Sequence, residues 1–217
     1  EFSLNFDGTD DYVEYGTTNL PTGDSPRTIS CWVLPRGTEQ SGVFGYGSST
    51  NNTAFEIMLY NHNGTLKPAV HYAGGNSGYQ SGLGVDLNQW NHIAATYDGT
   101  SSKIYVNGEL SITDPQVLNT DTTYRHIGAR NYGSPEDGQN LDGLIDEVAI
   151  WNRALTQEEI QDKMYRALHP AEEDSLVGYW RLDKGTGTTA IDLSGSVNHG
   201  TISGASWSDE VISLVPR

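Results

Sequence analysis

Short apolar segments separated by turn residues recur along most of this chain and leave few folds open to it. They run from "RTISCWVLP" at 27–35 to "LIDEVAIWN" at 144–152, and several alternate between apolar and polar residues. The dipeptides Asp98-Gly99 and Asn107-Gly108 favour tight hairpin turns, because these residue types accept positive φ at little cost. The pattern predicts antiparallel strands rather than the parallel sheet of an α/β protein.

One segment has helical rather than strand character. The stretch "ALTQEEIQDKMYRALHP" at 154–170 offers Thr156 as an N-cap, and Glu159 three residues later completes a capping box. Pro170 ends the helix. Two later segments, "SLVGYWRL" and "GTISGASW", again have the pattern of strands. We expect these strands to complete the same domain, because exposed sheet edges need covering.

Length and composition fit one large β domain. The chain has 217 residues, of which 35% are hydrophobic, so a sizeable core is possible. We predict an all-β fold, a two-sheet antiparallel β-sandwich with one short helix, over residues 3–209. Glu1 and Phe2 resemble a cloning-site scar and 214–217 a residual protease site, so both ends are left out of the fold prediction. We therefore expect the chain to come from a larger protein.

Charge and cysteine content narrow the possible partners. The net charge of −16, from 28 acidic and 12 basic residues, disfavours binding to nucleic acid or to an anionic membrane. Cys31 is the single cysteine and lies in an apolar run, so we expect a buried core residue and no internal disulfide. The sequence has no apolar stretch of about 18 residues, so we expect no membrane insertion.

Several phrases together resemble the laminin G-like, concanavalin A-like jelly-roll family, in the bacterial form related to pentraxins. They include "SLNFDGTDDYVEY", "WNHIAATYDGTSSKIYVNGEL", "LDGLIDEVAIWNRALTQEEI" and "LVGYWRLDKGTGTTAIDLSGSVNHGTISGASW". The resemblance implies two curved antiparallel sheets, with a carbohydrate or protein ligand on the concave face or on the loops at its rim. It also implies a structural calcium between the "FDG" turn and the "IDEV" strand, with Asp7 and Asp146 as ligands and a backbone carbonyl from Gly8.

The acidic residues permit a calcium site without reference to the family. Calcium takes six to eight hard oxygen ligands, and carboxylates cluster at Asp7, Asp10 and Asp11 and again at Asp142, Asp146 and Glu147. Along an extended strand Asp146 would share the side of Leu144 and Val148, where an isolated carboxylate is costly to bury. The alternative is that Asp7 and Asp10 are turn residues that bond the local backbone. We expect Asp10 and Asp11 to be turn residues, and Asp10 stays a further candidate ligand.

The sequence offers no recognisable catalytic pair. Glycoside hydrolases of this fold need two carboxylates about 5 Å apart on one strand face for a retaining mechanism. The acidic pairs here lie instead in the helix or in loops, as in "QEEIQD", "AEEDS" and "SPEDG". There is no nucleophile elbow and no zinc-ligand spacing. We expect no catalysis.

Polar, glycine-rich stretches supply the candidates for sugar contact. Aromatic rings can pack on the C–H face of a pyranose, while amide, imidazole and guanidinium groups bond hydroxyls. Arg130 could also clamp an acidic sugar bidentately. Asn51 and Gln80 are further polar candidates, and Trp207 is left open, whereas the other tryptophans are expected in the core. The predicted ligand-binding residues are Tyr46, His71, Tyr72, Asn76, Tyr79, Arg130, Asn131 and Tyr132; the alternative for each is an ordinary surface position.

Three functions remain open at this point. The first is a non-catalytic carbohydrate-binding module of a larger secreted or cell-surface polysaccharide-active protein, with a structural calcium and neighbouring catalytic or adhesin domains. Its partner would be a polysaccharide or oligosaccharide. The second is an adhesin or protein-interaction module. The third is a divergent glycoside hydrolase or lyase.

Overall fold

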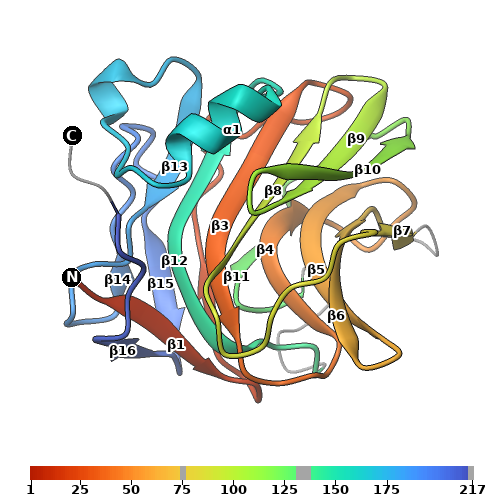
Figure 1. Cartoon of the computed structure of the whole chain (residues 1–217). Helices are drawn as coiled ribbons and strands as arrows, with labels where there is room; N and C mark the ends of the chain where they lie inside the picture. The colour runs from red at the N-terminus through yellow and green to blue at the C-terminus, as the bar shows by residue number, and fades with distance from the viewer. Residues whose placement is uncertain (74–76, 131–137, 215–217) are drawn as a thin grey trace.

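The computed structural model describes residues 1–73, 77–130 and 138–214, with the side chains of 77–80 left undescribed. Two antiparallel sheets face each other, with the amino end and residues 206–208 at the same side of the molecule (Figure 1). The elements are β1 (Ser3–Asp7), β2 (Tyr12–Glu14), β3 (Arg27–Pro35), β4 (Ser41–Gly47), β5 (Ala54–His62), β6 (Thr65–His71), β7 (Ser77–Gln80), β8 (Asn91–Tyr97), β9 (Ser101–Val106), β10 (Glu109–Pro115), β11 (Tyr124–Ile127), β12 (Asp142–Trp151), α1 (Gln157–Lys163), η2 (Pro170–Glu172), β13 (Leu176–Trp180), β14 (Thr189–Ala190), β15 (Gly200–Ser203) and β16 (Ser206–Ser208).

The two sheets confirm the predicted sandwich. The first sheet has the order β10-β9-β8-β3-β12-β1-β16, and β13 also pairs with β12. The second sheet has the order β14-β15-β2-β11-β4-β5-β6-β7. Each sheet turns one side toward the other, and we call the opposite side its outer face. The chain is therefore an all-β antiparallel sandwich with one short α-helix among its described residues.

The core fills the space between the sheets. Alternate residues of each strand point inward, as Ile29 and Cys31 do from β3 and Ile57 and Leu59 do from β5. Cys31 is fully buried, as predicted, and burial raises the pKa of its thiol. The Asn107-Gly108 turn between β9 and β10 has positive φ at both residues, which confirms the predicted hairpin.

A β-bulge in β12 changes which side each of its residues faces. The register of β12 against β3 shifts between Asp146 and Ala149, and Glu147 adopts a φ of +50°. Ile145, before the bulge, and Val148, after it, both lie in the central core although simple alternation would separate them. The prediction that Asp146 shares the side of Val148 assumed simple alternation along the strand. It is therefore wrong.

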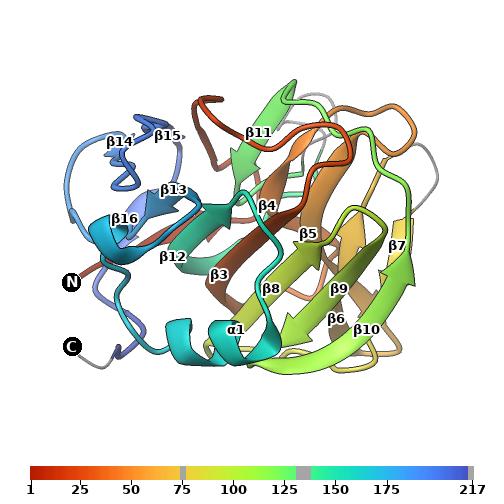
Figure 2. The ribbon, with the colours of Figure 1, turned by 90° about the horizontal axis from the view of Figure 1, so that it is seen from above.

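The helix α1 covers the outer face of the first sheet (Figure 2). The Thr156 side chain accepts from the backbone of Glu159 while the Glu159 side chain bonds the backbone of Thr156, which confirms the predicted capping box. Leu155 and Ile160 pack with Trp151 in a second apolar cluster on that face. The helix is shorter than predicted and is capped at its end by Met164.

The strands that follow the helix join both sheets. β13 pairs with β12 and β16 with β1 in the first sheet. β15 pairs with β2 in the second sheet, and β14 pairs with β15 at its edge. The segment from 176 to 208 therefore extends the same two sheets.

Candidate functional site

Polar side chains form a row across the outer face of the second sheet. The cross-strand register places Glu14, His126, Gly45, Glu56 and His71 opposite one another, on β2, β11, β4, β5 and β6. Their neighbours along each strand, among them Val13, Ile127, Phe44, Ile57 and Val70, lie in the core. Because side chains alternate along a strand, the row must face away from the core.

Glycines in β4 let the side chains of this row approach each other. A Cβ at Gly45 would lie 2.4 Å from the Cα of Glu56, and a Cβ at Gly42 would lie 2.3 Å from the backbone nitrogen of Arg130. Real Cβ atoms do not come so close, so only glycine fits at either position. The central strand therefore carries no side chain between β11 and β5 at Gly45.

A buried acid, a histidine and an arginine form a network on this face. His71 Nδ1 lies 3.4 Å from Glu56 Oε2, and the two side chains are 4% and 0% exposed. Arg130 Nη2 lies 3.2 Å from His71 Nε2, and Arg130 Nη1 donates to Gln139 Oε1 at 2.9 Å. A guanidinium can only donate, so Nε2 of His71 is the acceptor in its contact with Arg130, while Nδ1 faces Glu56 without a hydrogen bond to it. This network holds the Arg130 side chain in a defined position.

Aromatic rings gather beside the network. The rings of Tyr12 and His126 meet edge to face at 5.3 Å, and those of Tyr124 and His126 lie 6.4 Å apart. Both tyrosines are partly exposed and His126 is buried, which lowers its pKa. Glu14 and Arg125 form an ion pair at the edge of the group. The face thus combines partly exposed rings with directional hydrogen-bonding groups.

Two of the predicted ligand-binding residues lie in contact with each other, and two others are buried in the core. The structure brings His71 and Arg130 together on the outer face. Tyr46 and Tyr72 are wrong, because their rings are 0% and 1% exposed and belong to the central core. The Tyr46 hydroxyl donates to the Pro21 carbonyl at 2.8 Å. Tyr46 shares the inward parity of Phe44 on β4, and Tyr72, directly after β6, shares that of Val70, a signal that was present in the sequence.

The remaining predicted residues cannot be placed on this face from the structure. Asn76, Asn131 and Tyr132 lie outside the described residues, and Tyr79 belongs to β7 with its side chain undescribed. The sequence analysis missed Tyr12, Tyr124, His126 and Glu56. A charged residue within the apolar strand "AFEIMLY" was a signal for Glu56, since its neighbours Phe55 and Ile57 both face inward.

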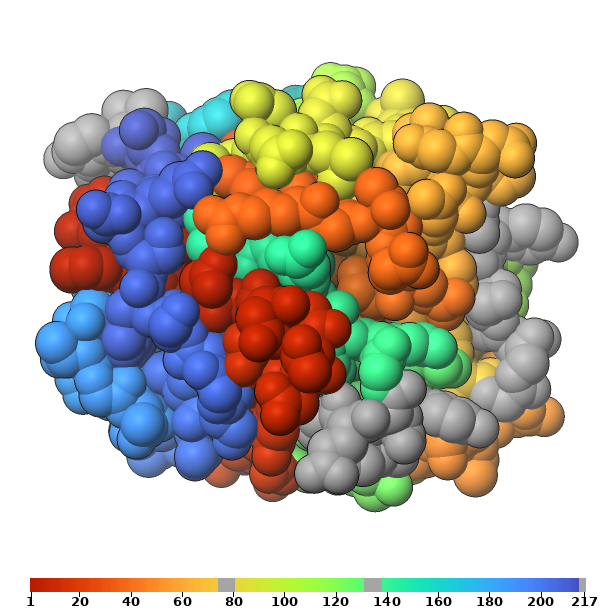
Figure 3. Space-filling model, turned by 90° about the horizontal axis from the view of Figure 1, so that it is seen from below, coloured from red at the N-terminus to blue at the C-terminus, as the bar shows by residue number. Residues whose placement is uncertain are grey.

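The aspartates near the amino end form a compact turn. Asp7, Asp10 and Asp11 each have a carboxylate oxygen within 4.8 Å of the others. Asp7 Oδ1 accepts from the backbone of Thr9 at 2.8 Å, and Asp11 Oδ2 accepts from the backbone of Asp7 at 2.9 Å. These bonds are those expected of turn residues. A pocket of about 180 Å³ beside the turn is lined by Asp7, Gly8, Gly37, Glu39, Ser41, Asn140 and Asp142, and Figure 3 shows the face on which these segments meet.

Asp146 lies apart from this turn. In the ladder between β1 and β12, Asp7 stands opposite Asp142, and Asp146 is four residues further along, about 13 Å at the usual rise per residue. Burial, with the neighbouring charge of Glu147, raises the pKa of Asp146 to about 8. Glu147, which Tyr179 contacts through its hydroxyl, has a pKa raised by burial to about 7. The structure therefore does not bring Asp7 and Asp146 together around one ion.

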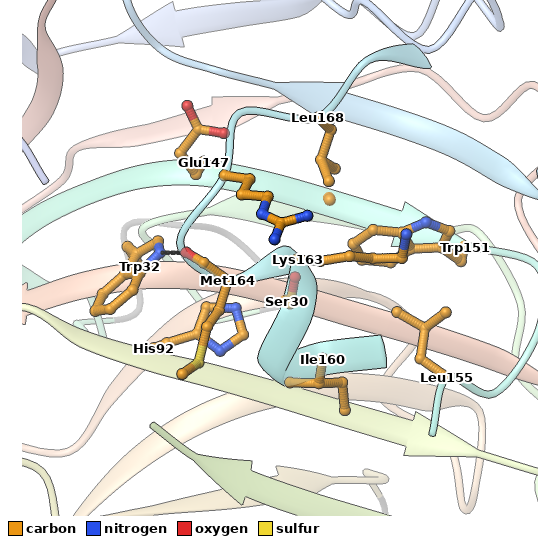
Figure 4. A pocket seen from close by; sticks show the side chains of 12 residues that line it. Ser30, Trp32, His92, Glu147, Trp151, Leu155, Ile160, Lys163, Met164 and Leu168 are labelled. Carbon is orange, nitrogen blue, oxygen red and sulfur yellow. Dashed lines mark hydrogen bonds between the residues drawn. The ribbon is translucent and has the colours of Figure 1, made fainter. Parts of the chain in front are cut away.

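The space beneath α1 is too small for a sugar (Figure 4). Its volume of about 20 Å³ suits about one water molecule. Trp32 Nε1 donates to the Met164 carbonyl there at 2.7 Å, and the buried His92 ring lies beside it with a pKa lowered to about 3 by burial. The outer face of the first sheet is therefore closed, in contrast to the polar face of the second. Among the described residues, no helix has the length and apolar character needed to cross a membrane.

Comparisons with known proteins agree with this architecture. A solved structure from Bacteroides ovatus ATCC 8483, named provisionally as a carbohydrate binding protein, has a TM-score of 0.74 at 22% identity and covers 99% of this chain and 61% of that one. Domain 4 of AbnA, a GH43 extracellular arabinanase from Geobacillus stearothermophilus in complex with arabinotriose, has a TM-score of 0.51 at 21% identity, covering 68% of this chain and 70% of that one.

A curated relative matches part of the chain, and a family model identifies the family. Adhesion G-protein coupled receptor D1 of Homo sapiens is 27% identical over 122 residues, which make up 53% of this chain but 13% of the receptor. The match therefore spans a small part of that relative. The model of the Laminin_G_3 family, the concanavalin A-like lectin/glucanases superfamily, matches residues 7–161. Because this match covers more than half of the chain, the protein belongs to the Laminin_G_3 family of concanavalin A-like proteins.

Proposed function

We propose that this chain is a carbohydrate-binding module that holds a polysaccharide or oligosaccharide on the outer face of the second sheet. The observation that carries the proposal is the pair of partly exposed rings, Tyr12 and Tyr124, around His126, next to the Arg130–Gln139 bond. Rings offer a surface for the C–H face of a sugar, and the arginine and amide groups bond hydroxyls. The similarity to a sugar-bound arabinanase domain and to a carbohydrate binding protein supports this assignment.

The proposed module is non-catalytic. The carboxylates that the register places on the described part of this face are Glu14 and Glu56, on β2 and β5. β11 and β4 lie between these strands, so three inter-strand spacings of about 4.8 Å separate them by about 14 Å. Retaining and inverting glycosidases need about 5 and about 6.5–9.5 Å respectively. This pair is too far apart for either mechanism, which supports binding without hydrolysis.

Calcium remains part of the proposal, with a changed set of ligands. The Asp7, Asp10 and Asp11 carboxylates, together with carbonyl groups of the turn, are hard oxygen donors of the kind that calcium prefers. Asp146 is excluded from this set by its place on β12. Bound calcium would stabilise the fold through linkage. We expect chelator to lower the melting temperature of calcium-loaded protein, and an Asp10→Asn variant to lose this response; an unchanged melting temperature would remove calcium from the account.

We also propose where the protein acts and what kind of chain it belongs to. A carbohydrate-binding module acts on extracellular or surface polysaccharide, so we place the protein outside the cell. We further propose that it belongs to a larger chain with a catalytic or adhesin domain. The similarity of about half of this chain to a small part of a much longer receptor supports this placement.

A glycan array tests the proposed function. Binding should appear for at least one polysaccharide, and Tyr124→Ala should weaken it about tenfold or more, since truncation of a central aromatic contact has effects of this size. Tyr165→Ala is the matched control, because Tyr165 is a 45% exposed tyrosine that contacts Trp32 on the opposite side of the sandwich. Absence of binding to every glycan would contradict the proposal and favour a protein partner, and release of reducing ends from a glycan would contradict the non-catalytic assignment.

A further inference from the structure

A larger pocket lies at the edge of the sandwich that is formed by the last strands of the chain. Its volume is about 320 Å³, within the range of small-molecule sites, and its lining residues are Leu182, Asp183, Lys184, Ile191, Leu193 and Trp207. β16 ends the first sheet and β14 ends the second, at the left of Figure 1. The polar network of the second sheet is centred on β4, β5 and β6, several strands away. We call this space the Trp207 pocket.

Trp207 is held in a fixed orientation in this pocket. It lies on β16 opposite Leu4 of β1, and its ring packs against the central core while remaining partly exposed. Trp207 Nε1 donates to the Gly187 carbonyl at 2.9 Å. Because the single polar atom of the ring is already bonded, the ring can offer a ligand only its apolar surface.

Exposed apolar side chains lie beside the Trp207 ring and extend its apolar surface. Ile191 and Leu193 are 39% and 41% exposed, and they line the pocket together with the buried Leu182. Single exposed apolar residues are normal in proteins, but two beside a partly exposed tryptophan in one concave site indicate binding. The pocket therefore has a rigid apolar wall ready for a ligand.

Two opposite charges stand at the same pocket. Asp183 and Lys184 are both exposed, and Asp183 Oδ2 lies 3.3 Å from Arg181 Nη1, which orients the carboxylate. The carboxylate accepts hydrogen bonds and the ammonium donates them, so together they match hydroxyl groups. Among the residues that line the pocket these two charges balance, which suits a neutral ligand. An apolar wall with hydroxyl-matching groups fits a neutral sugar ring.

We propose that the Trp207 pocket binds one neutral sugar unit and forms a second glycan subsite. The C–H face of the ring lies against Trp207 and Leu193, and its hydroxyls bond Asp183 and Lys184. This inference rests on the proposed function, because it assumes that the module recognises glycans. Two subsites on one rigid domain would make a long polymer bind more tightly than a short oligosaccharide, since the second contact becomes intramolecular.

Titration of the whole protein with neutral trisaccharides tests the subsite. The probes are arabinotriose, xylotriose, cellotriose and mannotriose, and the readout is the indole N–H resonance of Trp207. At least one probe should shift this resonance. Trp207→Ala should weaken the binding at this pocket about thirtyfold, read from the backbone resonances of the pocket, and Asp183→Asn about fivefold.

A second pair of variants guards against loss of folding in Trp207→Ala. Leu193→Ser replaces a 41% exposed side chain and should weaken binding, while Val197→Ser is its matched control because Val197 is 67% exposed in the same segment and does not line the pocket. Equal effects of the two serine variants would overturn the proposal. So would the absence of a Trp207 shift with all four probes.

The same titration separates this inference from the proposed function. Tyr124→Ala should leave the Trp207 response unchanged, because the two sites are independent. Shifts at Tyr12 and Tyr124 without a shift at Trp207 would overturn the second subsite and leave the proposed function standing. A shift of the Trp207 resonance without shifts at Tyr12 and Tyr124 would support the subsite. It would contradict the outer face of the second sheet as the principal site.

Discussion

The outer faces of the two sheets differ although the same alternation of residues builds them. On the first sheet α1 lies over the strands, Ile160 of the helix and Leu155 just before it pack with Trp151, and the space that remains is about 20 Å³. On the second sheet the corresponding positions carry Glu56, His71 and His126, with glycines between them. One face is therefore used for stability. The other carries these buried polar groups beside the partly exposed rings of Tyr12 and Tyr124, and is the face to which we assign sugar binding.

Removal of apolar contact beneath the helix should have the largest effect on stability. Ile160 is 2% exposed and packs against the first sheet, so Ile160→Ala should lower the free energy of unfolding by about 3 kcal/mol. Urea unfolding measures this change. Glycan affinity of the folded variant should stay unchanged, and a loss of affinity equal to that of Tyr124→Ala would break the distinction between the two faces.

Two buried histidines, one on each outer face, allow matched substitutions that compare the two faces. His71→Phe should lower the free energy of unfolding by about 2 kcal/mol, because it leaves Glu56 and Arg130 without the group that joins them. It should also weaken glycan binding, since Arg130 loses its support. His92→Phe is the matched control: within the described part of the chain His92 Nδ1 has no hydrogen-bond partner, and its ring meets that of Trp32 edge to face.

His92→Phe should therefore cost less stability and leave glycan binding unchanged. Unfolding curves and binding isotherms of both variants measure the difference. If the two variants weakened glycan binding equally, the recognition role of the second sheet would be contradicted.

The dependence of stability on pH gives the smallest predicted effect. The pKa of Asp146 is raised in the folded protein, so between its unfolded value near 4 and its folded value of about 8 the folded state binds more protons than the unfolded state. Stability must then fall as pH rises through this range. We expect the melting temperature to be lower at pH 8 than at pH 5, and Asp146→Asn to reduce the difference. A steady rise in melting temperature over this range that Asp146→Asn left unchanged would contradict the assignment.

Much of the fold was predictable because its signals are local. The Asn107-Gly108 hairpin, the Thr156 capping box and the burial of Cys31 each depend on residues close together in the sequence. The place of Asp146 was not predictable in the same way, because the bulge at Glu147 interrupts the alternation and no nearby residue signals it. The pairing of Asp7 with Asp142 likewise depends on the register of two distant strands.

The candidate site was predicted in part for a related reason. His71 and Arg130 were chosen for their chemistry and lie in contact with each other, whereas Tyr46 and Tyr72 were chosen for their rings without regard to strand parity and are buried. Tyr12 and Tyr124 come from strands far apart in the sequence, and only the sheet order brings their rings to His126. A site built across strands needs the register as well as the residue types.

Hydrogen exchange of the whole protein with and without a bound oligosaccharide shows which face of the sandwich holds the ligand. We predict that a ligand identified on the array slows backbone exchange in β2, β11, β4 and β5, and leaves α1 and the strands beneath it unchanged. Protection confined to α1, β3 and β8, with none on the second sheet, would contradict the assignment of the outer face of the second sheet as the glycan-binding surface.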